Sequence, residues 1–277
     1  MPLTASRTEL TFEAYDFQDR LVLSETVNVT TDQFDMAFDG LRISEVHYHP
    51  SDPSPTESSA GYDDADAFEF VELANVGQQT IDLSAVALEQ VRFEGRQQGV
   101  SFDFSSSEIQ QLEPGDRVVV VENLNAFRHR YGADTVVAGE WSGGLNNATE
   151  MITLTVHGRE WIQVTYQDDW YPSTDGAGAA VQAIDRPQRE VGVVSQPNAW
   201  RPSSLDGGTP GRDDVPAGDA NRDGVFNYAD LVFAMIAGEY NDSVEGNSTW
   251  EEGDWNRDGE FNSEDIVFVF RIGAYVF

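Results

Sequence analysis

Residues 112–132, LEPGDRVVVVENLNAFRHRYG, carry three successive signals that decide the fold of the surrounding chain. The tetrapeptide EPGD is typical of a tight turn, because proline fixes one backbone angle and glycine accepts a positive φ. The run RVVVVEN is short, β-branched and apolar, which favours a buried strand. LNAFRHRYG then has the length and composition of a short helix. A turn, a strand and a helix are therefore predicted here.

Short apolar runs of the same kind lie on both sides of this segment. Turn residues rich in Gly, Pro, Asn and Asp separate them, as in PSDPSP and SGGLNN. The runs are LRISEVHYH, AFEFVELAN, MITLTV and WIQVTY, and they fall between Leu41 and about Trp200. Several short strands at this spacing predict an all-β sandwich, with LNAFRHRYG as its single short helix. The fold class we expect is therefore mainly β.

The chain on either side of this region has a different character. Residues 1–40 contain alternating apolar stretches, LTFEAYDF and RLVLSETVNV, which predict an N-terminal strand segment. This segment is a candidate remnant of a preceding domain. Downstream, RPSSLDGGTPGRDDVPAG is rich in Pro, Gly, Ser and Asp and breaks the periodicity. We therefore predict a sandwich at residues 41–205, a linker at 206–216 and a separate module at 217–277.

The C-terminal module repeats itself. GDANRDGVFNYADLVFAMIAGEY, residues 218–240, aligns without a gap with GDWNRDGEFNSEDIVFVFRIGAY, residues 253–275. A hard dication prefers about six to eight oxygen ligands, and a 12-residue loop supplies them from positions 1, 3, 5, 7, 9 and 12, with glycine at position 6. Both repeats fit this pattern, with Gly224 and Gly259 at the turn. The sequence therefore predicts two calcium ions, one in each loop.

The predicted ligands all present oxygen. The first loop would supply Asp219, Asn221, Asp223, the Val225 carbonyl, Asn227 and Asp230, and the second would supply Asp254, Asn256, Asp258, the Glu260 carbonyl, Asn262 and Asp265. Nitrogen and sulfur ligands are missing, which argues against zinc or copper, and magnesium usually keeps more water than this loop allows. A pair of metal-free turns is the alternative, but it does not explain the oxygen side chains at positions 9 and 12.

Apolar residues accompany each loop. Position 8 is Phe226 in one repeat and Phe261 in the other, and the residues after position 12 predict a helix that faces the core. These are Leu231, Val232 and Phe233 in the first repeat, and Ile266, Val267 and Phe268 in the second. Pro216 and Gly218 precede the first loop, and NSTWEEG precedes the second, so we expect no helix entering either loop.

With aspartate at position 12 and no entering helices, residues 217–277 resemble a type I dockerin across their whole length. The resemblance implies a small α-helical, non-catalytic module that tethers extracellular proteins to a cohesin-like partner, often in polysaccharide-degrading assemblies. It also implies recognition residues at loop positions 10 and 11, which here are Tyr228, Ala229, Ser263 and Glu264. The two pairs differ, which argues against a symmetric two-way binding mode. Plain solvent exposure, in a calcium-stapled end cap without a partner, is the alternative.

Residues 41–211 resemble a bacterial lamin tail domain, which is an immunoglobulin-like β-sandwich. Five ordered segments carry the resemblance: ISEVHYHP at 43–50, EFVELANVGQQTIDLS at 69–84, LEPGDRVVVVENLNAFRHRYG at 112–132, WSGGLNNATEMITL at 141–154 and PNAWRPSSLDGGTPG at 197–211. The family carries no common catalytic residues, and a shared sandwich does not give a shared activity. The resemblance implies an adhesion, spacer or protein-binding role.

The charge of the chain limits its partners. The formal net charge is −33 over 277 residues, and the sequence contains no lysine and no cysteine. Nucleic acid and anionic membrane would repel such a surface, so we expect neither as a partner. No run approaches the ~20 apolar residues of a membrane span. The start MPLTASRTEL has no apolar run resembling a secretory signal, so the extracellular or cell-surface location that the modules imply requires a signal outside this chain.

Two further groups of polar residues are weaker candidates. His47 and His49 lie two apart on a predicted strand and could chelate a metal, but no third ligand is recognisable. Five acids lie close together along the chain and could hold a third cation or form a glycosidase pair, although a solvated loop explains them as well. They are Asp63, Asp64, Asp66, Glu69 and Glu72.

No nucleophile elbow, phosphate-binding glycine loop or Cys-His pair is present, so no motif supports an enzyme. A hydrolase, or an accessory part of an extracellular polysaccharide-degrading system, stays open as the alternative function.

Overall fold

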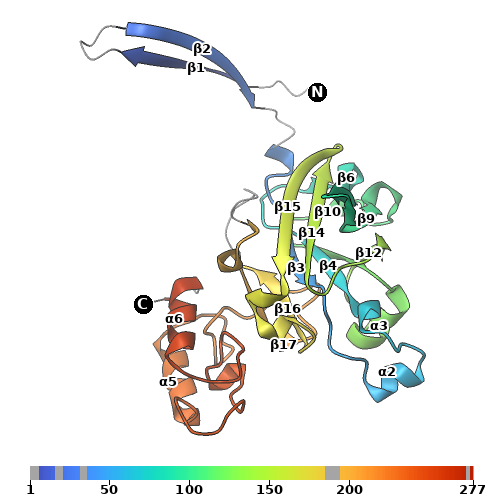
Figure 1. Cartoon of the computed structure of the whole chain (residues 1–277), viewed down its shortest axis with the longest axis vertical. Helices are drawn as coiled ribbons and strands as arrows, with labels where there is room; N and C mark the ends of the chain where they lie inside the picture. The colour runs from blue at the N-terminus through green and yellow to red at the C-terminus, as the bar shows by residue number, and fades with distance from the viewer. Residues whose placement is uncertain (1–5, 16–20, 32–35, 185–193, 273–274, 277) are drawn as a thin grey trace.

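The structure, a computed structural model, describes residues 6–15, 21–31, 36–184, 194–272 and 275–276. Two larger β-sheets dominate it (Figure 1). One sheet has six strands in the order β12-β11-β4-β3-β16-β17, all antiparallel except the parallel pair β11 and β12. Its strands are β3 (Leu41–His47), β4 (Phe70–Asn75), β11 (Arg117–Val121), β12 (Val137–Glu140), β16 (Ala179–Ala183) and β17 (Trp200–Asp206). The predicted mainly-β class is confirmed.

The second sheet has five antiparallel strands in the order β13-β9-β6-β14-β15. Its strands are β6 (Val86–Glu89), β9 (Val100–Asp103), β13 (Ser142–Gly143), β14 (Thr149–Val156) and β15 (Arg159–Gln167). The two sheets share one apolar core, to which Leu73 and Val118 contribute from the first and Leu88 and Leu154 from the second. The sheets therefore form a β-sandwich of the immunoglobulin-like kind.

The run of four valines in β11 is buried along its whole length, unlike a strand with one solvated face. Val118 and Val120 belong to the sandwich core, whereas Val119 and Val121 pack on the other face with Phe127 of the helix α3 (Leu124–Tyr131). The register pairs Val118 with Leu73 and Val121 with Phe70 of β4. A helix on the outer face thus explains why this strand reads as continuous hydrophobic sequence rather than as an alternation.

The turn and the helix around β11 form as predicted. Asp116 N–H donates to the Glu113 carbonyl at 3.0 Å, and Gly115 has a φ of +88°. The Asn123 side chain then caps α3 by accepting from Ala126 N–H at 3.0 Å. These local interactions place α3 against the six-stranded sheet.

The prediction of a single short helix in the sandwich was wrong. A second one, α2 (Pro55–Ser59), begins at the end of PSDPSP, where the sequence predicts a turn. Ser54 and Glu57 form a reciprocal capping box, with Ser54 N–H donating to Glu57 at 2.7 Å. The S-x-x-E spacing before a proline at the first helical turn is the signal that would have found it.

Three two-stranded sheets and several short 3-10 helices complete the β region. The paired strands are β1 (Ser6–Tyr15) with β2 (Leu21–Thr31), β5 (Ile81–Asp82) with β10 (Gln111–Leu112), and β7 (Val91–Phe93) with β8 (Arg96–Gln98). The 3-10 helices are η1 (Ala65–Phe68), η2 (Leu83–Ala85), η3 (Phe104–Ser106), η4 (Asp168–Trp170), η5 (Pro172–Thr174) and η6 (Pro197–Ala199). The β1–β2 hairpin lies within the predicted N-terminal strand segment and stands away from the sandwich (Figure 1).

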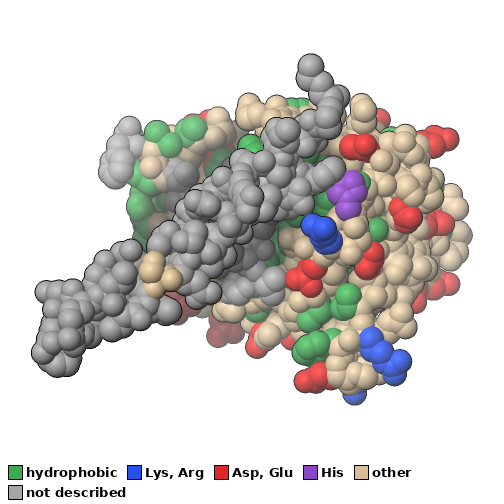
Figure 2. All heavy atoms as spheres, turned by 90° about the horizontal axis from the view of Figure 1, so that it is seen from above, with side chains coloured by type: hydrophobic (Ala, Val, Ile, Leu, Met, Phe, Trp, Pro, Cys, Tyr) green, Lys and Arg blue, Asp and Glu red, His purple; other side chains and the backbone are tan. Residues whose placement is uncertain are grey.

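The C-terminal segment contains α5 (Tyr228–Ala237), the 3-10 helix η7 (Trp250–Glu252) and α6 (Ser263–Ile272). In the described part of the chain, no α-helix leads into either repeat, as the sequence predicted. No described helix is long and apolar enough to cross a membrane. Figure 2 shows acidic side chains scattered over one face of the sandwich with few arginines among them, in keeping with the formal charge of −33.

Candidate metal-binding loops

The first repeat folds into a tight loop held by its own acidic side chains. The Asp219 carboxylate accepts from the backbone N–H groups of Asp223 and Gly224, at 3.0 and 2.8 Å. At the other end of the loop, Asp230 accepts from the N–H groups of Asn221 and Asn227, at 3.2 and 2.8 Å. Residues from both ends of the 12-residue stretch therefore gather around one centre.

The second repeat makes the same bonds 35 residues later. Asp254 accepts from the N–H groups of Asp258 and Gly259, at 3.0 and 2.9 Å. Asp265 accepts from Asn256 and Asn262, at 3.0 and 2.9 Å. Because the register of these bonds is identical in the two loops, the duplication seen in sequence extends to the backbone conformation.

The remaining predicted ligands lie in equivalent places too. Asn221 and Asn256 each accept from the N–H group two residues later, at 2.8 Å in both loops. Asp223 and Asp258 do the same, accepting from Val225 and Glu260 at 3.1 and 2.9 Å. Asn227 caps α5, and Asn262 likewise accepts at 2.7 Å from the first turn of α6. Each loop thus runs directly into its helix.

The glycine predicted at the sharp turn is required by the backbone. Gly224 and Gly259 both have a φ of +92°, a region that favours glycine. The residues at loop position 4, Arg222 and Arg257, also lie in the left-handed region, with φ of +58° and +60°.

The acidic groups are crowded in the second loop. Burial, together with the nearby carboxylates of Asp265 and Asp258, raises the pKa of Asp254 to about 7. Burial also raises the pKa of Asp219 in the first loop, with Asp230 and Asp223 adding to the effect. A dication placed among these groups would stabilise their charged forms.

Among the described residues, no three His, Cys, Asp or Glu side chains are arranged as a ready-made metal cluster. The loops combine three aspartates each with asparagine side chains and a backbone carbonyl. Oδ1 of Asp265 accepts two N–H groups, from Trp255 and Asn256, but its Oδ2 accepts only one. A carboxylate oxygen that accepts one N–H keeps a second lone pair, so a bound cation is compatible with these bonds.

Phe226 and Phe261, at loop position 8, form the centre of the module. Both are buried, and Trp255 lies between them with ring centroids 5.9 and 5.5 Å away. The exit helices were predicted to face the core, and this was right only in part. Phe268 is buried, but Phe233 is 49% exposed and Val267 is 66% exposed. Both helices therefore carry apolar side chains on two faces.

The residues expected to contact a partner lie at the surface at the start of each helix. Tyr228 is 68% exposed, Ala229 is partly buried, and Ser263 and Glu264 are exposed. The rest of α5 continues the apolar character of Tyr228, since Val232, Met235 and Ile236 are also exposed. The corresponding first turn of α6 is polar.

The two histidines bind different neighbours. His47 is fully buried, and its Nδ1 lies 3.2 Å from the hydroxyl of Tyr131. Burial lowers the pKa of His47 to about 3. The Nδ1 of His49 lies 2.6 Å from Asp175. No metal cluster includes either histidine among the described residues.

The acids at 63–72 separate in the structure. Asp63 and Asp64 are exposed on a loop, whereas Glu69 is buried. Burial, with a smaller effect of the nearby acids Asp66, Glu122 and Glu150, raises the pKa of Glu69 to about 10. No short-range pattern predicts this group, because Glu122 approaches Glu69 through the pairing of neighbouring strands and Glu150 comes from β14 of the other sheet.

Glu72 belongs to a different group. It lies 2.8 Å from Nη1 of Arg117 and accepts from Gly211 N–H at 2.6 Å. Its buried neighbour on β3, Glu45, accepts from Thr209 N–H at 2.9 Å. Glu45 had not been identified from the sequence. These carboxylates fasten the chain after β17 to the six-stranded sheet and do not form an open pair with Glu69.

The fold defines an immunoglobulin-like β-sandwich followed by a small segment of duplicated loop-helix units. The lamin tail domain family model matches residues 35–168, which contain the whole five-stranded sheet and most of the other. Over these residues the match supports a lamin tail domain. Strands β16 and β17 and both loops lie outside the matched residues. No curated protein and no solved structure matches the chain significantly.

Proposed function

We propose that the chain is a non-catalytic, secreted or surface-displayed modular protein whose C-terminal segment is a dockerin that binds two calcium ions. The observation that carries this proposal is the identical hydrogen-bond register of the two loops, in which Asp219 and Asp254 fold the backbone in the same way. In each loop this register gathers the aspartates of positions 1 and 12 around one centre, where a calcium loop places its ligands.

The chemistry of the loops selects the ion. The predicted ligands are carboxylate, amide and carbonyl oxygens, which suit a hard cation with many ligands. Asp254 and Asp265 are buried beside each other, and this arrangement costs free energy unless a positive charge offsets it. Calcium supplies that charge.

The exposed apolar face of α5 is the surface we propose for docking to a cohesin-like protein. Tyr228, Val232 and Ile236 follow one another at spacings of four residues and are each more than 40% exposed. Such a stripe is costly on an isolated soluble protein and is typical of a binding surface. Because Ser263 and Glu264 make the start of α6 polar, we expect docking in a single orientation.

The test is direct binding to a panel of immobilised recombinant cohesin domains, in calcium and in excess chelator. We expect binding in calcium alone, and a loss of about tenfold or more for Ile236→Asp, which places a charge on the α5 face. Val76→Asp is the matched control, because Val76 is 47% exposed but lies on the sandwich. Equal binding by the Ile236→Asp variant would show that α5 is not the docking surface.

A calcium-stapled cap without a partner is the second candidate. Side chains of the module, including Phe226 and Phe268, belong to the same apolar core as the sandwich, as a terminal cap would require. In that case calcium would stabilise the chain, and no member of the cohesin panel would bind. The sandwich would serve as an adhesion or spacer domain under either proposal.

A further inference from the structure

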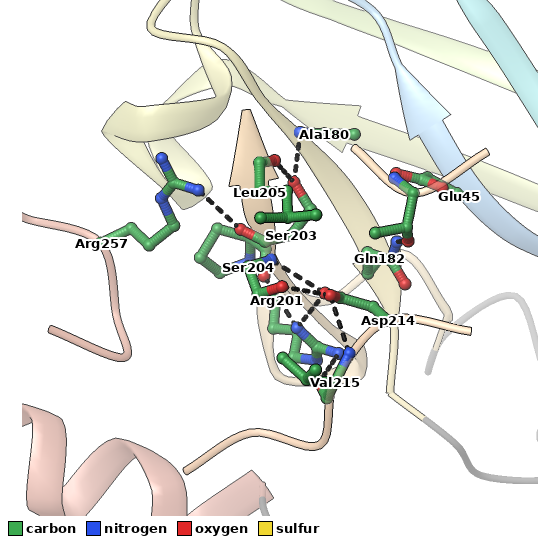
Figure 3. Close-up of polar contacts among 12 residues, drawn as sticks. Glu45, Ala180, Gln182, Arg201, Ser203, Ser204, Leu205, Asp214, Val215 and Arg257 are labelled. Carbon is green, nitrogen blue, oxygen red and sulfur yellow. Dashed lines mark hydrogen bonds and ion pairs between the residues drawn. The ribbon is translucent and has the colours of Figure 1, made fainter. Parts of the chain in front are cut away.

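The second loop touches the sandwich through one arginine. Arg257 occupies loop position 4, between the predicted ligands Asn256 and Asp258. Its Nη1 donates to the Ser203 carbonyl at 3.0 Å (Figure 3). Its Nη2 lies 2.5 Å from the carboxylate of Asp206. Ser203 and Asp206 both belong to β17, the edge strand of the six-stranded sheet.

The equivalent arginine of the first loop has a different partner. Arg222 has nearly the same backbone conformation as Arg257, but its Nε donates to Glu251 at 2.6 Å, inside the module. The two repeats therefore use the same position for different purposes. Only the second one binds the β-sheet through it.

The acceptor strand is held firmly by the chain that follows it. Arg201 Nη1 lies 2.7 Å from Asp214, and Arg201 Nη2 donates to the Val215 carbonyl at 2.9 Å (Figure 3). Ser204 N–H donates to the same Asp214 carboxylate at 2.8 Å. The segment predicted as a linker is thus fastened along β17, so Arg257 meets a surface with a defined geometry.

Contacts of aromatic rings on both sides of the loop support the same arrangement. Phe268 of α6 lies edge-on to Tyr171 of the sandwich, with ring centroids 6.1 Å apart. Just before the loop, the ring of Trp250 lies 5.7 Å from the guanidinium of Arg201. Arg257, Phe268 and Trp250 come from three successive parts of the second repeat, and all contact the sandwich.

We call the contact of Arg257 with Ser203 and Asp206 the joint. We infer that the joint depends on calcium: calcium bound in the second loop fixes the module on the β-sandwich, and the sandwich in turn raises the calcium affinity of this loop. The inference rests on the proposed function, because it requires calcium in the loop.

The physical reason is that the joint exists only when the loop is wound. Arg257 reaches β17 from a left-handed backbone conformation inside the loop, with φ of +60°. The wound form brings the carboxylates of Asp254 and Asp265, both buried, to one centre, so without a cation their mutual repulsion opposes it. Calcium and the joint both favour this form, so each must strengthen the other by the same factor.

Calcium titration of the full chain by calorimetry tests the joint with three variants. Arg257→Gln removes the cation of the ion pair, and Asp206→Asn removes its anion. Arg222→Gln is the matched control, because it removes the same charge from the equivalent position of the first loop. If only net charge mattered, Arg257→Gln would bind calcium more tightly because it removes a positive charge near the site. Asp206→Asn would bind calcium more weakly because it removes a negative charge. The joint predicts that both weaken one of the two sites, by about two- to fivefold, as expected for a partly exposed ion pair. The Arg222→Gln variant should keep that site at full affinity.

A distance measurement provides an independent readout. Because the chain has no cysteine, Ser106→Cys on the sandwich and Ser243→Cys on the module give a clean pair for spin labels at exposed positions. Calcium should narrow the distance distribution of the otherwise unmodified chain and leave that of the Arg257→Gln variant broad.

The outcomes separate the two proposals. Two-site binding that is unchanged in the Arg257→Gln and Asp206→Asn variants would overturn the joint and leave the calcium proposal intact. Tighter binding by the Arg257→Gln variant would likewise overturn it, since charge alone explains that result. Absence of calcium binding by the unmodified chain would overturn both proposals.

Discussion

Asp219 and Asp254 occupy the first position of two loops and accept hydrogen bonds from the same backbone positions, four and five residues further along the chain. Each aspartate therefore winds its loop around itself, and a second aspartate closes the loop from its other end. This equivalence makes the module a structural duplication and connects its stability to the charge at the loop centres.

The centre of the module should be sensitive to truncation. Phe261→Ala removes a ring that is 1% exposed and that packs on Trp255, so we expect a loss of about 3–5 kcal/mol in the free energy of unfolding of the module. Phe270→Ala, at a ring that is 50% exposed, should cost much less. Denaturant unfolding followed by tryptophan fluorescence measures both, and similar losses would contradict the assigned core.

The turn glycines should tolerate no side chain. Gly259→Ala places a Cβ on a residue with φ of +92°, which we expect to cost about 1–2 kcal/mol and to lower the melting temperature of the module. Gly144→Ala is the control, because its added Cβ meets no atom within 4 Å and its φ lies outside the left-handed region. Differential scanning calorimetry should separate the two variants. Equal melting temperatures would refute the role of this turn.

Glu69 should make the sandwich less stable as pH rises. Its pKa is about 10 in the folded chain, well above the usual 4.5, because burial penalises the charged form. Its stabilising contribution is complete below about pH 4.5 and is lost progressively as pH rises toward 10, at up to about 1.4 kcal/mol per pH unit. The variant Glu69→Gln cannot ionise, so its free energy of unfolding should rise relative to that of the unmodified chain between roughly pH 5 and 9, where the carboxyl loses its contribution. Parallel stability curves over this range would contradict the buried neutral carboxyl.

Glu57 should show the opposite dependence. Arg130 donates to both of its oxygens, at 2.7 and 3.0 Å, and holds the pKa of Glu57 at about 2. The resulting stability is complete above the usual pKa of 4.5 and is lost as pH falls through 2. Glu57→Gln should cost about 2 kcal/mol near neutral pH and progressively less in acid. A cost that is constant with pH, measured by urea unfolding, would exclude this pairing.

Local patterns predicted the elements whose causes are local. The turn at Glu113–Asp116, the helix that Asn123 caps and the duplicated loops all follow from residue types at short spacings. The first turn of α2 carried such a signal as well, in Ser54 and Glu57, but the surrounding prolines obscured it.

Other features depend on how distant segments meet. Nothing near Glu69 in the sequence places it beside Glu122 and Glu150, because Glu122 approaches it through strand pairing and Glu150 comes from the other sheet. Similarly, Phe233 and Val267 read as core residues, yet they face solvent because each helix packs through only one side. The contact of Arg257 with Asp206 joins a loop to a strand about 50 residues earlier, and no short pattern encodes such a pair.

The most direct measurement is a calorimetric calcium titration of the full chain after chelator treatment, repeated with Asp230→Ala and Asp265→Ala. The account predicts two ions bound by the unmodified chain, and one fewer in each variant, because each aspartate closes one loop. An unmodified chain that binds no calcium, or variants that keep the full stoichiometry, would contradict the proposed sites.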